Sequence, residues 1–215
     1  MSADSAPQRS NRTTRATERT RRVRRSAALT AGLAATALLV SACGSGGTSG
    51  GGGNTNFVTS TDGVATVAQG KRTPAPDLSG KTIAGKNLDV ADYKGKVVVL
   101  NVWGSWCNPC RAEAKYFSKV SKEYADKGVQ FVGINTRDTS TGAALAFEKD
   151  WGITYPSLYD PTGKLLLRFK KGTLNPQAIP STLILDRDGR IAARSLSALS
   201  EERLLKMLKP VVAEK

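Results

Sequence analysis

The chain has no histidine and only three cysteines, Cys43, Cys107 and Cys110, among its 215 residues. The absence of histidine excludes Ser–His–Asp triads, Cys–His nucleophilic pairs and histidine-ligated metal sites. We therefore expect the chemistry of this protein to depend on cysteine, carboxylates or the backbone, with no metal ion and no other cofactor.

The chain also lacks a dense block of lysine and arginine after its N-terminal segment. Its net charge is +14. Residues 1–42 contribute +6 of this, because they contain eight arginines and only two acidic residues, Asp4 and Glu18. From Lys71 onward, basic and acidic residues are interspersed, and no aromatic side chains alternate with the basic ones as they do in nucleic-acid sites. We therefore expect no nucleic-acid partner, and interpret the excess charge as a solvated surface near anionic lipid.

The chain has no apolar run of the length that spans a bilayer. The apolar run at 26–40 follows the basic sequence RRVRR and is too short for a membrane-spanning helix, which predicts an export signal peptide over residues 1–42. The last residues of this segment, with Cys43, resemble a bacterial lipobox. This resemblance implies that Cys43 carries lipid and anchors the protein to the membrane. The alternatives for Cys43 are a plain thiol and a third redox cysteine.

Residues 43–56 consist mainly of glycine, serine, threonine and asparagine. A flexible coil of this length reaches about 20 Å, which suits a linker between a lipid anchor and a folded domain. We expect the folded domain to occupy residues 57–215, a length sufficient for one sizeable core.

Strand and helix patterns alternate along the expected domain, which indicates an α/β fold with a central mixed sheet flanked by helices. Runs of β-branched residues predict buried strands at 96–103 and 129–135. Apolar residues at helical period predict helices at 108–126 and 141–151.

Turn residues mark the other boundaries of the expected fold. Asp62 and Gly63 predict an N-terminal hairpin extension over 57–67, and turn residues at 159–163 follow the second helix. The elements expected after this turn are strands at 165–169, 181–186 and 190–195, and a final helix that begins at Ser200.

The most specific motif is Trp106-Cys107-Asn108-Pro109-Cys110, placed where the strand at 96–103 meets the following helix. It resembles the thioredoxin active site. The wider pattern, from around residue 73 to residue 213, resembles the exported TlpA/ResA-like thiol–disulfide oxidoreductases of the redoxin/AhpC-TSA superfamily, and implies a thioredoxin-like fold. The motifs that support this resemblance are Ala75-Pro76-Asp77, Arg111-Ala112-Glu113, Ile179-Pro180-Ser181-Thr182 and residues 185–189.

In a site of this kind Cys107 is expected to attack disulfides as a thiolate, because the N-terminus of a helix favours negative charge. Cys110 lies one turn further along and is expected to be less exposed and to resolve the mixed disulfide. Pro109 fixes the turn that brings the two sulfurs together. One alternative is a purely structural disulfide, although a bridge that closes a loop of two residues stabilises the fold little. The other alternative is that the pair forms half of a zinc site, although no further cysteine or histidine lies near it.

Two positions near the cysteines distinguish branches of the superfamily. Thioredoxins have a buried aspartate six residues before the first cysteine, where this chain has Asn101, whose amide cannot accept a proton from Cys110. ResA-like proteins have a glutamate three residues after the second cysteine, which is Glu113 here. We expect Glu113 to lie on the same helical face as Cys110, to have a raised pKa and to carry a proton during exchange. The alternative is an exposed Glu113 paired with Arg111 or Lys115.

Pro180 matches the cis-proline that faces the cysteine pair in this fold. We expect a cis Ile179–Pro180 bond that turns the Ile179 backbone toward an extended segment of a partner. The alternative is a trans proline at the start of an edge strand. We also expect Trp106 to cover the sulfurs, whereas Trp103 is assigned either to the site or to the core.

The resemblance implies a monomeric, lipid-anchored reductase at the extracytoplasmic face of the cell membrane. Its partners would be protein thiols and disulfides, among them the haem-attachment cysteines of apocytochrome c, and a membrane electron donor of the CcdA type. The pair Asn108-Pro109 is closer to the Gly-Pro of thioredoxin than to the Pro-His of DsbA, which favours reduction.

Three other functions remain open at this stage. A DsbA-like protein would form disulfides in exported proteins. A peroxiredoxin-like peroxidase needs a threonine before its cysteine, and the residues before Cys107 lack it. A binding module or metallochaperone with a thioredoxin fold would not need the cysteine chemistry.

Overall fold

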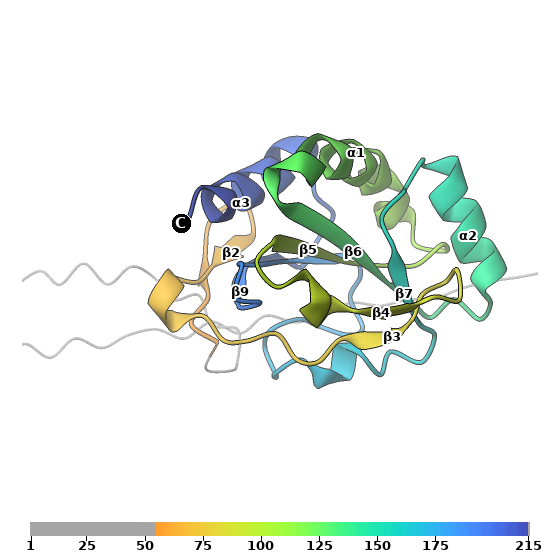
Figure 1. The fold of residues 1–215 in the computed structure, drawn as a ribbon, viewed down its shortest axis with the longest axis horizontal. Coiled ribbons are helices and arrows are strands. Elements are labelled where there is room, and N and C mark those ends of the chain that lie inside the picture. The colour runs from red at the N-terminus through yellow and green to blue at the C-terminus, as the bar shows by residue number, and fades with distance from the viewer. Residues whose placement is uncertain (1–54, 215) are drawn as a thin grey trace, which may run out of the picture. The chain divides into compact units, whose positions relative to one another are not determined.

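The computed structural model describes residues 55–214. The expected signal peptide, Cys43 and the linker up to residue 54 lie outside the described residues, so these expectations stay untested. One mixed sheet dominates the described part of the chain (Figure 1). Its seven strands lie in the order β1 (Val58–Thr59), β2 (Val64–Thr66), β9 (Ile191–Ser195), β8 (Ser181–Leu185), β5 (Val97–Trp103), β6 (Val129–Thr136) and β7 (Ser157–Asp160).

The three strands β5, β6 and β7 are parallel, and the other pairings in this sheet are antiparallel. A separate two-stranded ladder joins β3 (Ser79–Lys81) and β4 (Asn87–Asp89). The helices are α1 (Asn108–Tyr124), α2 (Thr141–Asp150) and α3 (Glu201–Ala213), with short 3₁₀ turns η1 (Gln69–Lys71), η2 (Val90–Tyr93), η3 (Ala125–Lys127) and η4 (Leu166–Arg168). Within residues 55–214, no helix has both the length and the apolar composition needed to cross a membrane.

β5 is the central strand and is buried along its whole length. Successive side chains of a strand point to opposite faces, so its odd and even positions belong to two different layers. Val97 and Val99 pack with α1 and α3, whereas Val98 and Leu100 pack with the connection between β7 and β8. In Figure 1, α1 and α3 accordingly lie on one face of the sheet and η4 lies on the other. By the same alternation, Asn101 faces the helix layer.

α1 begins at the cysteine pair and has clear signals at both ends. Cys107 is its N-cap residue, and Pro109 occupies the first turn, where a missing N–H costs no helical hydrogen bond. Beyond α1 and η3, Gly128 adopts a left-handed conformation with φ of 75°, which glycine adopts without steric cost. The helix predicted at 108–126 is therefore confirmed.

Most of the other expected elements are confirmed, but the strand expected at 165–169 is wrong, and β3, β4 and β7 were not predicted. The expected turn at 159–163 overlaps β7, since Tyr159 and Asp160 belong to that strand. The strand expected at 165–169 is instead the 3₁₀ turn η4. The apolar residues there follow neither the strand nor the helix period. They are apolar because this connection packs against the sheet through Leu166 and Phe169. The N-terminal hairpin and the β8–β9 hairpin lie where the sequence predicts them.

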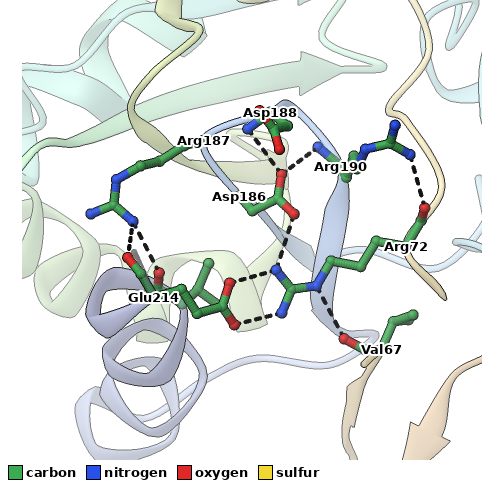
Figure 2. Close-up of polar contacts among 8 residues, drawn as sticks. Val67, Arg72, Asp186, Arg187, Asp188, Arg190 and Glu214 are labelled. Atoms are coloured by element: carbon green, nitrogen blue, oxygen red, sulfur yellow. Dashed lines mark hydrogen bonds and ion pairs between the residues drawn. The ribbon is translucent and has the colours of Figure 1, made fainter. Parts of the chain in front are cut away.

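A cluster of charged groups lies at the end of the sheet where β5 begins (Figure 2). The guanidinium of Arg72 donates to Asp186 at 3.0 Å and to both carboxylate oxygens of Glu214 at 2.6 Å. Its Nε donates to the backbone of Val67 at 3.1 Å. Arg187 donates to the Val212 carbonyl in the last turn of α3 at 3.1 Å and to the carbonyl of Glu214, the residue after the helix, at 2.7 Å. This cluster ties the segment after the N-terminal hairpin to the C-terminal helix.

Candidate active site

Cys107 and Cys110 form a disulfide at the N-terminus of α1. The Cys107 sulfur accepts a hydrogen bond from the backbone N–H of Cys110 at 3.2 Å, and thus satisfies one of the free donors of the first helical turn. Both cysteines are almost fully buried, with 3% of Cys107 and 2% of Cys110 exposed. The sequence led us to expect a clear difference in exposure. In the disulfide state the two residues instead share one apolar environment.

The environment of the disulfide comes from four segments that are distant in the sequence. Trp103 at the end of β5 stacks on Phe147 of α2, with 4.6 Å between the ring centroids. The other side chains in this cluster include Ile83, Ala114, Ala144 and, partly buried, Ile179. Trp103 therefore belongs to the core around the sulfurs.

Trp106 lies at the edge of the site and is 49% exposed. Its ring lies 4.7 Å from the guanidinium carbon of Arg137. A covering role over the sulfurs stays a prediction for this side chain.

Glu113 is buried one turn beyond Cys110 on α1, with 1% of the residue exposed. Its two carboxylate oxygens accept hydrogen bonds from the Asn101 amide at 3.0 Å and from the Leu199 backbone N–H at 2.9 Å. Burial raises the pKa of Glu113 to about 7, against the opposing effect of these two hydrogen bonds. The expected raised pKa is confirmed, and the alternative of an exposed Glu113 paired with Arg111 or Lys115 is wrong.

The peptide bond between Ile179 and Pro180 is cis, as the sequence motif predicts. Pro180 is buried immediately before β8, and Ile179 packs against the cluster that contains the disulfide. The segment that ends at this proline therefore lies beside the cysteine pair, although about 70 residues separate them in the chain.

Asp138 is a residue of the site that sequence reasoning did not find. It is buried just after β6 and accepts hydrogen bonds from the backbone N–H of Ser105 at 2.9 Å, from the Ser105 hydroxyl at 2.5 Å and from the Asn135 amide at 2.6 Å. These bonds hold the loop before Cys107 against the end of β6. An acidic residue shortly after a buried parallel strand was the available signal, because such strand ends meet at one edge of the sheet.

A second set of polar contacts behind the disulfide also went unnoticed. The indole N–H of Trp103 donates to the Ser157 hydroxyl at 3.3 Å, and this hydroxyl donates to Glu148 at 2.7 Å. Gly133 makes room for this pair, since an ideal Cβ there would lie 2.1 Å from the Ser157 oxygen. Burial raises the pKa of Glu148 to about 7. The side chain lines a cavity of about 510 Å³ shared with Ile83 and Tyr155.

The arrangement combines an exchangeable disulfide with a buried carboxyl group that can change its protonation near neutral pH. This is what thiol–disulfide exchange requires, because thiolates must form and be reprotonated as the bonds rearrange. Within the described residues, no three Cys, Asp or Glu side chains gather closely enough to hold a metal ion. The reactive groups that the fold places at the start of α1 are the two sulfurs, with the Glu113 carboxyl one turn further along the helix.

Comparison with known proteins agrees with this geometry. Residues 68–208 match the Redoxin family. The thiol-disulfide oxidoreductase ResA of Bacillus thuringiensis is 29% identical over 137 residues, which cover 64% of this chain and 76% of ResA.

Two solved structures are also similar. One is a DsbF homologue from Corynebacterium diphtheriae, with 37% identity, a TM-score of 0.64 and coverage of 69% of this chain and 92% of that one. The other is a secreted thiol-disulfide isomerase from Corynebacterium glutamicum, with 33% identity, a TM-score of 0.66 and coverage of 72% and 96%. This chain belongs to the redoxin family and is a thiol–disulfide oxidoreductase with a thioredoxin-like fold.

Proposed function

We propose that this protein is a reductase that transfers two electrons from the Cys107–Cys110 dithiol to disulfides of exported proteins. The observation that carries the proposal is the position of the Cys107 sulfur. It accepts a backbone N–H at the first turn of α1, where the unpaired donors and the helix dipole stabilise a thiolate.

The reaction proceeds in two displacements. The Cys107 thiolate attacks one sulfur of the client disulfide, the client S–S bond breaks, and the other client sulfur leaves as a thiolate. Cys110 then loses its proton and attacks the Cys107 sulfur. The Cys107–Cys110 bond forms, the second client sulfur leaves, and the client has gained two electrons while the protein has been oxidised.

Glu113 is the acceptor of the Cys110 proton and returns it to the leaving client sulfur. It lies three residues after Cys110, so both occupy the buried face of α1. With a pKa of about 7 it is present in both protonation states at neutral pH. Asn101 supports this role by donating to the carboxylate, and Pro109 and Pro180 position the sulfurs and the client segment.

The protein acts outside the cell membrane, anchored as a monomer by lipid on Cys43. The signal-like segment 1–42, the lipobox-like residues before Cys43 and the glycine-rich linker support this location. The similarity to a secreted isomerase supports export as well. The clients include the cysteine pair of apocytochrome c, and a membrane protein of the CcdA type returns electrons to the disulfide.

Trapping of the client tests the proposal. In Cys110→Ala the mixed disulfide cannot be resolved, so covalent adducts through Cys107 should accumulate and be identified by mass spectrometry. The matched control Cys107→Ser should trap nothing. Adducts that form equally in both variants would show that Cys107 is not the attacking sulfur.

The direction of electron flow has a separate test. The midpoint potential, measured in a glutathione or dithiothreitol buffer, should lie closer to the thioredoxin value of about −270 mV than to the DsbA value of about −120 mV. A potential above about −180 mV, the range of disulfide isomerases and oxidases, would assign the protein to disulfide formation instead. Replacement of Cys43 by Ser should release the protein from the membrane fraction.

A further inference from the structure

The loops at the disulfide carry arginines but no ion-paired acid. The part of the β7–β8 connection that reaches the site, residues 175–180, contains no charged residue, and Arg168 further back in this connection is paired with Asp77. The segment from β9 to α3, residues 196–200, contains no charged residue. The two other segments at this end contribute Arg111 at the start of α1 and Arg137 after β6.

The acidic groups near these loops are not available to balance the arginines. Asp138 is buried and its two oxygens already accept three hydrogen bonds from Ser105 and Asn135. Glu113 is buried between Asn101 and Leu199. Among the described residues, neither Arg111 nor Arg137 has a carboxylate within ion-pair distance, whereas other cations of the domain do.

Arg137 spans the two segments that flank the disulfide. Its guanidinium carbon lies 4.7 Å from the ring of Trp106, the residue before Cys107. One terminal nitrogen lies 3.5 Å from the carbonyl oxygen of Gln177, two residues before Ile179. Its backbone has a φ of 60°, an uncommon conformation for a residue with a side chain. The guanidinium is therefore placed at the point where a client segment must enter between Trp106 and the loop before Pro180.

The donors of Arg137 are mostly unused. A guanidinium has five N–H donors in a planar fork, and here one contact, with Gln177, is long. The Nε atom is buried and has no hydrogen-bond partner. Arg111 on the other side donates to the Ser105 carbonyl at 2.8 Å and packs over Phe147. Its remaining donors also face no carboxylate among the described residues.

We propose that Arg137, assisted by Arg111, recognises an acidic side chain next to the client disulfide, so that the preferred substrates are protein segments with aspartate or glutamate beside a cysteine. This inference rests on the proposed exchange function and names its substrate class. Arginine suits this task because its planar fork matches a carboxylate bidentately. The Trp106 ring lies 4.7 Å from the guanidinium carbon. Because Nε is buried, the two terminal nitrogens, one of which makes the long contact with Gln177, are the donors offered to the client carboxylate.

Three peptides test the specificity. Each contains one internal disulfide and differs only in the residue before the first cysteine, which is Asp, Ser or Lys. We expect the dithiol form of the protein to reduce the Asp peptide faster than the Lys peptide by about tenfold at 20 mM salt. The arginines attract the Asp side chain and repel the Lys side chain, and both effects are those of exposed charges. The ratio should fall toward 1 at 500 mM salt, because exposed charges are screened.

Variants locate the effect. Arg137→Gln should reduce the Asp-to-Lys ratio to about threefold or less, with a further fall in the double variant with Arg111→Gln. Lys94→Gln removes the same charge from an exposed position at the opposite end of the sheet and should leave the ratio unchanged. The salt titration of the unaltered protein gives an independent answer if Arg137→Gln proves poorly folded.

The outcomes separate two questions. Equal rates for the three peptides, or a ratio that Arg137→Gln does not change, would overturn the recognition of acidic clients while the reductase proposal stands. The ratio is also measured in reverse, with reduced peptides and the disulfide form of the protein. A protein that proves to be an oxidase still shows the preference there, so failure of the reductase proposal leaves this test intact.

Discussion

At the end of the sheet where β5 begins, Arg72 lies buried between Asp186 and Glu214, with hydrogen bonds to both carboxylates (Figure 2). At the end where β5 stops, Glu113 is buried with two neutral donors, and no cation of residues 55–214 lies within ion-pair distance of it. Both regions bury ionisable side chains. They differ in whether an opposite charge is buried with them.

This difference decides which end of the molecule responds to pH. Hydrogen bonds to Glu214 and Asp186 raise the pKa of Arg72 above its already high value, so this group stays charged. Burial without an opposite charge brings the pKa of Glu113 to about 7. The ion-paired end therefore serves as a fixed clamp on the termini of the domain. The end with the disulfide contains a group that gains and loses a proton in the range where thiol exchange takes place.

Arg72→Met should have the largest effect on stability. It leaves Asp186 and Glu214 without their cation, and removal of one member of a buried pair costs about 4 kcal/mol. We expect this loss in the free energy of unfolding, measured by urea denaturation at pH 7. Exchange activity at a temperature where the variant is folded should be unchanged, since the cluster lies at the far end of β5 from the disulfide.

The control is Lys94→Met, which removes an exposed cation from the same end of the domain. It should change the free energy of unfolding by less than about 0.5 kcal/mol. If Arg72→Met also slows exchange by about tenfold or more in the folded protein, the two ends of the sheet are coupled, and the contrast between the ion-paired end and the site is wrong.

Glu113 should make the oxidised protein less stable as the pH rises from about 4.5 to about 7. Its pKa is about 7 in the folded protein against an ordinary value of 4.5. The folded state therefore binds the proton more tightly than the unfolded state does. The stability that this proton adds to the fold is complete below pH 4.5 and is lost as the pH rises through the folded pKa. The linked change amounts to about 3 kcal/mol. Urea denaturation at half-unit pH steps measures it.

Glu113→Gln should remove most of this pH dependence. The amide oxygen of Gln can accept from the Leu199 N–H, and its NH₂ group can donate to Asn101 once that amide turns to present its oxygen. The same variant, with Cys110 intact, should slow the resolution of the mixed disulfide between Cys107 and the client by about tenfold or more at pH 7, because Cys110 loses its proton acceptor. An unchanged pH profile of stability would show that Glu113 is already ionised throughout this range.

The sequence predicted the elements whose pattern is local and strong. β5, β6 and α1 follow from runs of β-branched residues and from a helical period, and the position of the cysteine pair follows from the strand–helix junction. The strand at 157–160 was missed because Asp160-Pro161-Thr162-Gly163 dominates it with turn signals. The expected strand at 165–169 was an apolar run too short to distinguish strand from buried loop.

The parts of the site that sequence reasoning missed depend on contacts between distant segments. Asp138 holds Ser105 across 33 residues, and Glu148 reaches Trp103 through Ser157. At the other end of the sheet, Arg72 likewise binds Glu214 across 142 residues. Nothing in the local pattern around these residues indicates their partners. Glu113 was predicted from the resemblance to ResA-like proteins and from its spacing of three residues after Cys110 on one helix, but its partners Asn101 and Leu199 were not.

Glu148→Gln should have the smallest effect of the three and tests whether the region behind the disulfide contains a second titrating group. The pKa of Glu148 is also raised to about 7 by burial, but its carboxyl lines an open cavity, so solvent screening reduces the linked change in stability to about 1 kcal/mol. The variant keeps an oxygen to accept from Ser157, which in turn accepts from Trp103.

The double variant with Glu113→Gln decides whether the two acids titrate independently. Both carboxylates raise the pKa of the buried Tyr155 hydroxyl, after the larger effect of burial, so they share a neighbour. If the two groups are independent, the losses of pH dependence should add to within about 0.5 kcal/mol. A combined loss clearly smaller than the sum would mean that one proton is shared across the core. The titrating group at this end of the sheet would then be the pair rather than Glu113 alone.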